Sequence, residues 1–178
     1  MNSKICEMLG IEFPLIAFSH CKDVVAQVSK AGGMGVLGAV GMTPEILEQE
    51  LKWIDDHIDG MPYGVDVLIP ASFKGKDEDL KPTDWAQMIP QEYRDFRADV
   101  LKQYDLDGED LRKQTEQNSN FGNNMRDETA KQMLEVAFSH PIKLIANALG
   151  VPPSWMLEMG KDNNVLVAAL VGAKEHAI

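Results

Sequence analysis

The stretch PLIAFSHCKDVVAQVSKAGGMGVLGAV, residues 14–40, decides the fold of this chain. Residues 14–18 are a short apolar run that predicts a buried strand, and valines then recur at helical spacing between residues 24 and 28. The Ala-Gly-Gly sequence at 31–33 ends that helix, and residues 35–40 form a second apolar strand. Because two parallel strands need a crossover between them, this order predicts a parallel α/β fold.

The same alternation continues along the chain. Thr43 and Pro44 predict the start of a helix, since threonine caps helices well and proline is tolerated at the first helical position. Gly60 is placed to end that helix. Three further apolar strands are expected, at residues 63–70, 143–147 and 165–170. The sequence therefore predicts about five parallel strands.

Length and charge limit the architecture and the partners. A complete (β/α)8 barrel typically needs ~250 residues, and this chain has 178. We therefore expect a partial (β/α)8 TIM barrel as a single domain over residues 1–178, with the charged residues 72–139 as a helical insertion after the third strand. The net charge of -11 argues against nucleic acid or an anionic membrane as the main partner and leaves small molecules or other proteins.

Cysteine usage and hydropathy indicate a cytoplasmic protein. Cys6 and Cys21 are too few for a disulfide framework, and the amino-terminal residues lack the apolar stretch of a signal peptide. The longest apolar runs fall far below the ~20 residues that cross a bilayer as a helix.

Ligand chemistry in a parallel α/β fold is expected at the carboxyl ends of the strands. Ser19, His20 and Cys21 follow the first strand, but adjacent residues usually point apart, which disfavours a Cys-His nucleophile. His20 is a candidate for lining a pocket, with a buried structural histidine as the alternative. The Gly-rich residues 38–41, at the end of the second strand, would let a flat ring approach the backbone.

Metal and dinucleotide sites are not expected. His57, His140 and His176 have no partners at metal-ligand spacing. Residues 32–35 are glycine-rich but precede a strand, whereas a dinucleotide fingerprint follows one, so we interpret them as a tight turn.

Several motifs in order resemble the nitronate monooxygenase family, formerly called 2-nitropropane dioxygenases. They are PLIAFSH at 14–20, AGGMGVLGA at 31–39, TPE at 43–45, YGVDV at 63–67 and ALGVPP at 148–153. The resemblance implies an FMN-dependent TIM-barrel oxidoreductase that converts an alkyl nitronate and O2 to a carbonyl compound and nitrite. In such an enzyme the protein positions the flavin, and the flavin carries the electron transfer.

The resemblance also implies site residues. The segment after the first strand runs along the flavin in this family, which corresponds to Ala17, Phe18 and Ser19, and a third-strand residue contacts the ring, which corresponds to Asp66. The family usually has Asn at that position. An ionised Asp66 can accept from the ring N3–H but cannot donate. The catalytic residue is unknown, because the family's histidine lies in a Gly-Gly-His segment that this sequence lacks.

Three functional hypotheses follow. The first is that the chain is the amino-terminal portion of a nitronate monooxygenase-like enzyme, inactive without the remaining strands. The second is a flavin-dependent enoyl reductase of the same barrel type. The third is a non-catalytic fragment acting by association, since five strands cannot close an eight-stranded barrel and their edges would favour a homo-oligomer or a partner chain.

Overall fold

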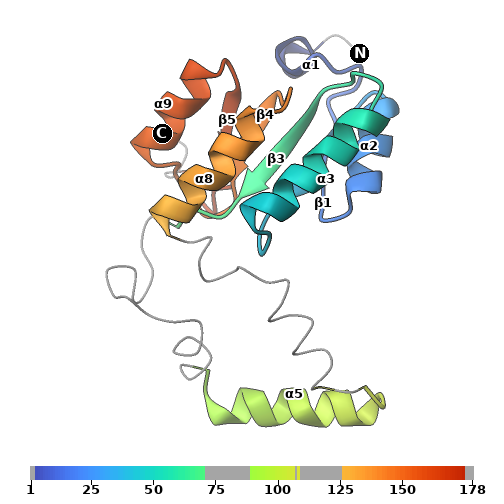
Figure 1. The fold of residues 1–178 in the computed structure, drawn as a ribbon, viewed down its shortest axis with the longest axis vertical. Coiled ribbons are helices and arrows are strands. Elements are labelled where there is room, and N and C mark those ends of the chain that lie inside the picture. Colours follow the sequence, from blue (N-terminus) through green and yellow to red (C-terminus); the bar gives the residue numbers. More distant parts are fainter. Residues whose placement is uncertain (1–2, 71–88, 107, 109–125, 175–178) are drawn as a thin grey trace.

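The computed structural model describes residues 3–70, 89–106, 108 and 126–174 (Figure 1). The helices and strands alternate along most of this length. In chain order they are α1 (Lys4–Leu9), β1 (Ile16–Ser19), α2 (Lys22–Lys30), β2 (Met34–Gly38), α3 (Pro44–His57), β3 (Tyr63–Val67), α5 (Gln91–Gln103), α8 (Asp127–Phe138), β4 (Leu144–Asn147), α9 (Ser154–Asp162) and β5 (Leu166–Ala169).

The five strands form one parallel sheet in the order β1-β2-β3-β4-β5. Each strand pairs with the next one in the sequence, and the register runs across the sheet from Gly38 to Asp66 and from Asp66 to Ala146. The predicted parallel α/β fold with five strands is therefore confirmed.

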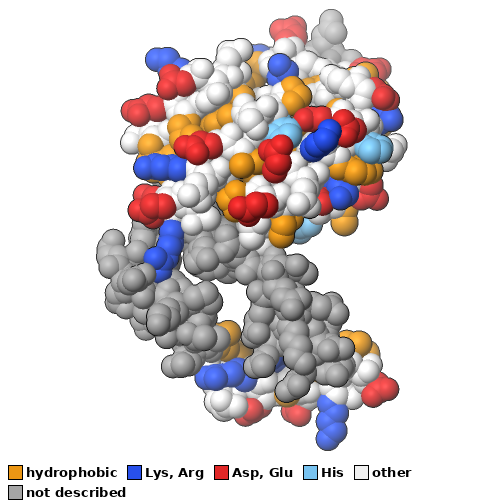
Figure 2. Space-filling view, viewed as in Figure 1, with side chains coloured by type: hydrophobic (Ala, Val, Ile, Leu, Met, Phe, Trp, Pro, Cys, Tyr) orange, Lys and Arg blue, Asp and Glu red, His pale blue; other side chains and the backbone are white. Residues whose placement is uncertain are grey.

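Helices α2, α3, α8 and α9 cover one face of the sheet (Figure 1). The main core lies between these helices and the strands and includes Leu37, Leu47, Leu134 and Met156. On the outside of the same helices, acidic and basic side chains alternate with small apolar patches (Figure 2). This distribution is that of a solvent-facing helical layer.

Local sequence explains where α2 and α3 pack and begin. Thr43 caps α3 as predicted, its side chain accepting from the backbone N–H of Ile46 at 3.3 Å, and Pro44 is the first helical residue. Helix α3 ends at His57, and Gly60 follows in the left-handed conformation, with φ of 74°. At Gly35 a side chain would collide with the backbone of Val25, so this glycine lets α2 lie directly on β2.

The strands are shorter than the apolar runs that predicted them. The third run continues to residue 70, but β3 ends at Val67. Asn147 explains the difference, because its buried side chain accepts from Ile69 N at 2.8 Å and donates to Ile69 O at 3.0 Å. These bonds engage the Ile69 backbone through a side chain instead of a strand partner.

Helix α8 falls within the expected insertion of residues 72–139, yet it packs on α3 and β3 as the crossover between β3 and β4. Its buried residues recur at helical spacing and are Ala130, Met133, Leu134 and Ala137. Helix α5 has no buried residue. Most of residues 71–125 lies outside the described part, so a separate insertion stays a prediction.

The outer strands differ from the inner ones. Every residue of β2, β3 and β4 is buried, whereas β1 and β5 carry exposed or half-buried residues throughout. This is the burial expected at the two edges of a sheet that is not closed. Among the described residues, no helix is long and apolar enough to span a membrane.

Candidate functional site

The sheet has a second face, opposite the four covering helices, which we call the interior face. Paired residues of parallel strands share a face, so the register defines its members. They are Ile16, Phe18, Met34, Val36, Gly38, Gly64, Asp66, Leu144, Ala146, Leu166 and Ala168.

Helix α1 covers the amino-terminal half of the interior face. Cys6 and Leu9 of α1 join Met34, Val36 and Leu144 in a second apolar cluster. The carboxyl-terminal half carries Phe18, Gly38 and Asp66 instead. This is the end of the strands at which parallel α/β folds bind ligands.

Gly38 is the point where three strand-end residues meet. A Cβ atom at Gly38 would lie 2.6 Å from Cζ of Phe18 and 2.7 Å from Nδ1 of His20. Nδ1 of His20 donates to the Gly38 carbonyl oxygen at 3.1 Å, and the Phe18 and His20 rings meet edge to face with centroids 5.0 Å apart. Because a carbonyl only accepts, Nδ1 is the protonated nitrogen of a neutral His20, and Nε2 keeps its lone pair.

Asp66 lies beside Gly38 in the neighbouring strand. It is only 3% exposed, and its Oδ1 is buried without a hydrogen-bond partner in the described part of the chain. Burial raises the pKa of Asp66 from 3.8 to about 6, and the nearby His20 opposes that shift. A buried polar atom without a partner is costly, so Asp66 offers an unused acceptor to a bound group.

The other residues expected after strand one are placed differently. Ala17 pairs with Gly35 and Ser19 with Leu37, so their side chains are on the helical face of the sheet. Ser19 Oγ accepts from the Cys21 backbone N–H at 3.0 Å, and Cys21 is exposed at the start of α2. Phe18 and Asp66 thus share the interior face, to which Ala17 and Ser19 can offer only backbone.

A polar cluster that the sequence did not predict lies at the opposite end of the strands. His140 Nδ1 is 2.6 Å from Asp55 Oδ2, and His140 Nε2 is 3.0 Å from Glu48 Oε2. Tyr63 donates to Asp55 Oδ1 at 2.7 Å. The two carboxylates raise the pKa of His140 against the effect of its burial, and burial with the Asp55 contact raises that of Tyr63.

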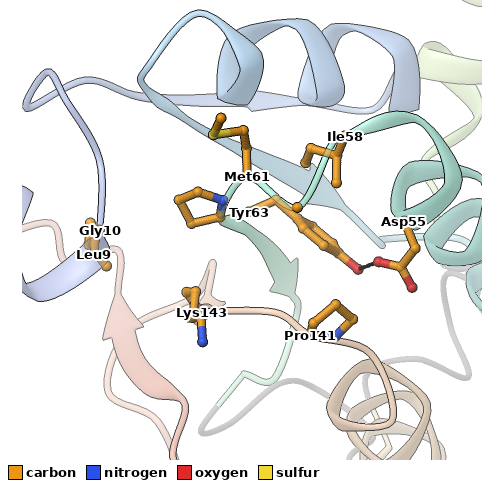
Figure 3. A pocket seen from close by; sticks show the side chains of 10 residues that line it. Leu9, Gly10, Asp55, Ile58, Met61, Tyr63, Pro141 and Lys143 are labelled. Atoms are coloured by element: carbon orange, nitrogen blue, oxygen red, sulfur yellow. Dashed lines mark hydrogen bonds between the residues drawn. The ribbon is translucent and has the colours of Figure 1, made fainter.

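Asp55 and Tyr63 also line a pocket of about 340 Å3 between α1, α3 and the starts of β3 and β4 (Figure 3). Its walls are mainly apolar, with Leu9, Met61 and Pro141 around the opening and Lys143 at its edge. The pocket is at the amino end of the strands, which in this class of fold contributes to stability more than to chemistry.

No group of three His, Cys, Asp or Glu side chains in the described ranges could hold a metal ion. His140 is engaged with two carboxylates, and His57 stacks on Trp53. His176 lies outside the described residues.

Comparison with known proteins places the chain in a family context. A family model described as nitronate monooxygenase matches residues 2–178. A relative from Mycobacterium tuberculosis, named putative monooxygenase Rv1533, is 44% identical over 178 residues, covering 99% of this chain and 47% of the relative. A probable nitronate monooxygenase from Staphylococcus saprophyticus is 22% identical, covering 100% of this chain and 45% of the relative.

Two solved structures share the fold. A nitroalkane oxidase from Streptomyces ansochromogenes superposes with a TM-score of 0.64 at 20% identity, covering 98% of this chain and 44% of the other. A FabK mutant from Thermotoga maritima gives 0.61 at 16% identity, covering 99% and 41%. The chain thus spans about half the length of the proteins it matches, consistent with a partial barrel.

Proposed function

Because the chain belongs to the nitronate monooxygenase family, we propose that it forms the flavin-facing part of an FMN-dependent oxidoreductase. In the assembled enzyme, an alkyl nitronate and O2 would give a carbonyl compound and nitrite. The chain spans about half the length of its relatives, so the proposed activity belongs to the assembled barrel, which we place in the cytoplasm.

The unpartnered Oδ1 of Asp66 is the observation that carries this proposal. It lies on the interior face at the carboxyl end of β3, beside a glycine that exposes backbone. The isoalloxazine ring of a flavin is flat and has one N–H group that needs an acceptor. Both features fit this surface, since Gly38 permits close approach and Asp66 provides the acceptor.

The residues would divide the work of holding the cofactor. Asp66 would accept from the ring N–H, Gly38 would leave room beside the ring, and Phe18 would supply an apolar edge. The bound FMN would supply the electron transfer between substrate and O2. Nε2 of His20 is left free by the bond from Nδ1 to Gly38, so it can accept a hydrogen bond from a group bound on this face.

Aspartate in place of the family's usual asparagine changes the charge of the site. When ionised, Asp66 only accepts hydrogen bonds, and its charge disfavours an anionic reduced ring nearby. Its pKa of about 6 means that a proton is gained under mildly acidic conditions. We therefore expect the assembled enzyme to hold reduced flavin more tightly below pH 6 than above it.

The reaction is tested with the assembled protein loaded with FMN. We expect O2 consumption and nitrite release with an alkyl nitronate, and no NAD(P)H oxidation with an enoyl thioester. Oxidation of NAD(P)H by the thioester, without nitrite from the nitronate, would replace this proposal with the enoyl reductase alternative.

A further inference from the structure

The two edges of the sheet expose an apolar surface that the described part of the chain does not cover. On β1, Ile16 is 48% and Phe18 is 54% exposed. At the other edge, Leu166 of β5 is 37% and Leu170 just beyond it is 55% exposed. Large apolar side chains at both edges of one sheet are unusual for a finished surface, because unpaired strands invite pairing.

These residues continue the interior face. Ile16 pairs with Met34 and Leu166 pairs with Leu144, and both partners belong to the apolar cluster beneath α1. The apolar surface therefore runs from the covered centre of the interior face out to β1 and β5. A polypeptide that paired with both edges would extend that cluster on both sides.

We propose that β1 and β5 are docking edges for a second polypeptide made of further parallel strand–helix units, supplied in trans. An eight-stranded barrel has no free edges, and five of its strands are present here. The matched relatives are about twice as long as this chain, so their remaining length is ample for three more units.

A second copy of this chain fits the surface less well. Two copies would bring ten strands to a barrel that holds eight. Each copy also carries the net charge of -11, so two copies repel one another. The occupant is therefore a strand–helix polypeptide of different sequence.

Docking would complete the candidate site. Phe18 and His20 are exposed at the β1 edge, while Asp66 lies two strands further in. A strand paired with β1 would lie next to both exposed side chains and would shield the surface beside Gly38 from water. The inference rests on the edges alone, so association can be measured without flavin.

The test uses the part of the Mycobacterium tuberculosis relative that lies outside the matched stretch, co-expressed with this chain. We expect a one-to-one complex by size-exclusion chromatography with light scattering. Ile16→Asp, which puts a charge on the β1 edge, should weaken the complex at least tenfold. Val24→Asp is the matched control, because Val24 is similarly exposed but lies on α2.

Far-UV circular dichroism of each variant alone separates docking from folding. Equal spectra and equal melting temperatures for Ile16→Asp and Val24→Asp, with only the first losing the complex, support the proposal. It is overturned if both variants bind equally, if no complex forms with the unaltered chain, or if this chain forms a homodimer that excludes the added polypeptide. FMN retention is scored separately, so that failure of the flavin proposal leaves the association result standing.

Discussion

Nδ1 of His20 lies 3.1 Å from the carbonyl oxygen of Gly38, in space that is free only because residue 38 has no side chain. Both residues are at the carboxyl ends of neighbouring strands. The contact fixes the imidazole against the sheet edge and leaves its other nitrogen free. The local geometry of the candidate site therefore depends on one glycine.

Gly38→Ala tests that dependence. The added methyl group would lie within 3 Å of the Phe18 and His20 rings, so we expect both rings to shift, at a cost of ~1–3 kcal/mol in the free energy of unfolding. Urea denaturation measures this cost. Gly172→Ala is the control, because nothing lies within 4 Å of a Cβ there. Equal stability of the two variants would contradict the close packing at Gly38.

Asp66→Asn tests the cost of burying a charge. The folded-state pKa of about 6 exceeds the ordinary value of 3.8, so the folded protein holds this proton more tightly than the unfolded chain does. Stability should therefore fall as pH rises from about 4 to about 6, by about 3 kcal/mol. We expect Asp66→Asn to remove that fall, measured by urea unfolding between pH 4 and pH 8.

The exposed Asp56→Asn serves as the control for this comparison. It should keep the pH dependence of the unaltered chain. An unchanged slope in Asp66→Asn would mean that the Asp66 carboxyl is solvated.

His140→Ala tests the cluster at the amino end of the strands. Both ring nitrogens can donate to Asp55 and Glu48 only when the imidazole is protonated, and these carboxylates raise the pKa of His140. The stabilisation is therefore complete below pH ~6.5 and is lost as pH rises through the higher folded-state value. Removing the ring should cost ~1–3 kcal/mol at pH 6 and less at pH 9.

Glu48→Gln gives an intermediate case, since it removes one of the two charges and leaves Asp55 with Tyr63. Thermal unfolding at both pH values provides the readout. A loss of stability in His140→Ala that is the same at pH 6 and pH 9 would rule out the charged pairing.

Asn147→Ala tests the bonds that engage the segment after β3. The buried amide makes three hydrogen bonds, two to the Ile69 backbone and one to the Gly150 carbonyl at 3.2 Å. Its removal leaves buried backbone groups unpaired, and we expect a loss of ~2–4 kcal/mol in unfolding free energy. Asn163→Ala removes an exposed amide bonded to Met159 O and should cost far less. Similar losses would show that the segment is held by other contacts.

Sequence patterns were sufficient for the framework of the fold. Apolar runs located all five strands, and the Thr43–Pro44 pair located the start of α3 to the residue. Strand alternation also placed Asp66 at a strand end, where ligands bind in this type of fold. These predictions worked because they depend on backbone geometry and burial over a few residues.

Contacts between distant segments could not be predicted in the same way. His140 meets Asp55 across 85 residues, and Asn147 meets Ile69 across 78. A single sequence carries no signal for such pairs. The one available hint was that Glu48 and Asp55 are seven residues apart, on one face of α3. Likewise, α8 was assigned to an insertion because its sequence gives no sign of which surface it packs against.

Binding of FMN to the barrel assembled from this chain and its co-expressed partner tests the central claim most directly. Titration by quenching of flavin fluorescence should show saturable binding. It should be weakened at least tenfold by Asp66→Ala, since a hydrogen bond to a charged group contributes ~1.5–3 kcal/mol, and unchanged by Asp56→Ala. Equal FMN affinity in Asp66→Ala and the unaltered protein would contradict the assignment of this face to the flavin.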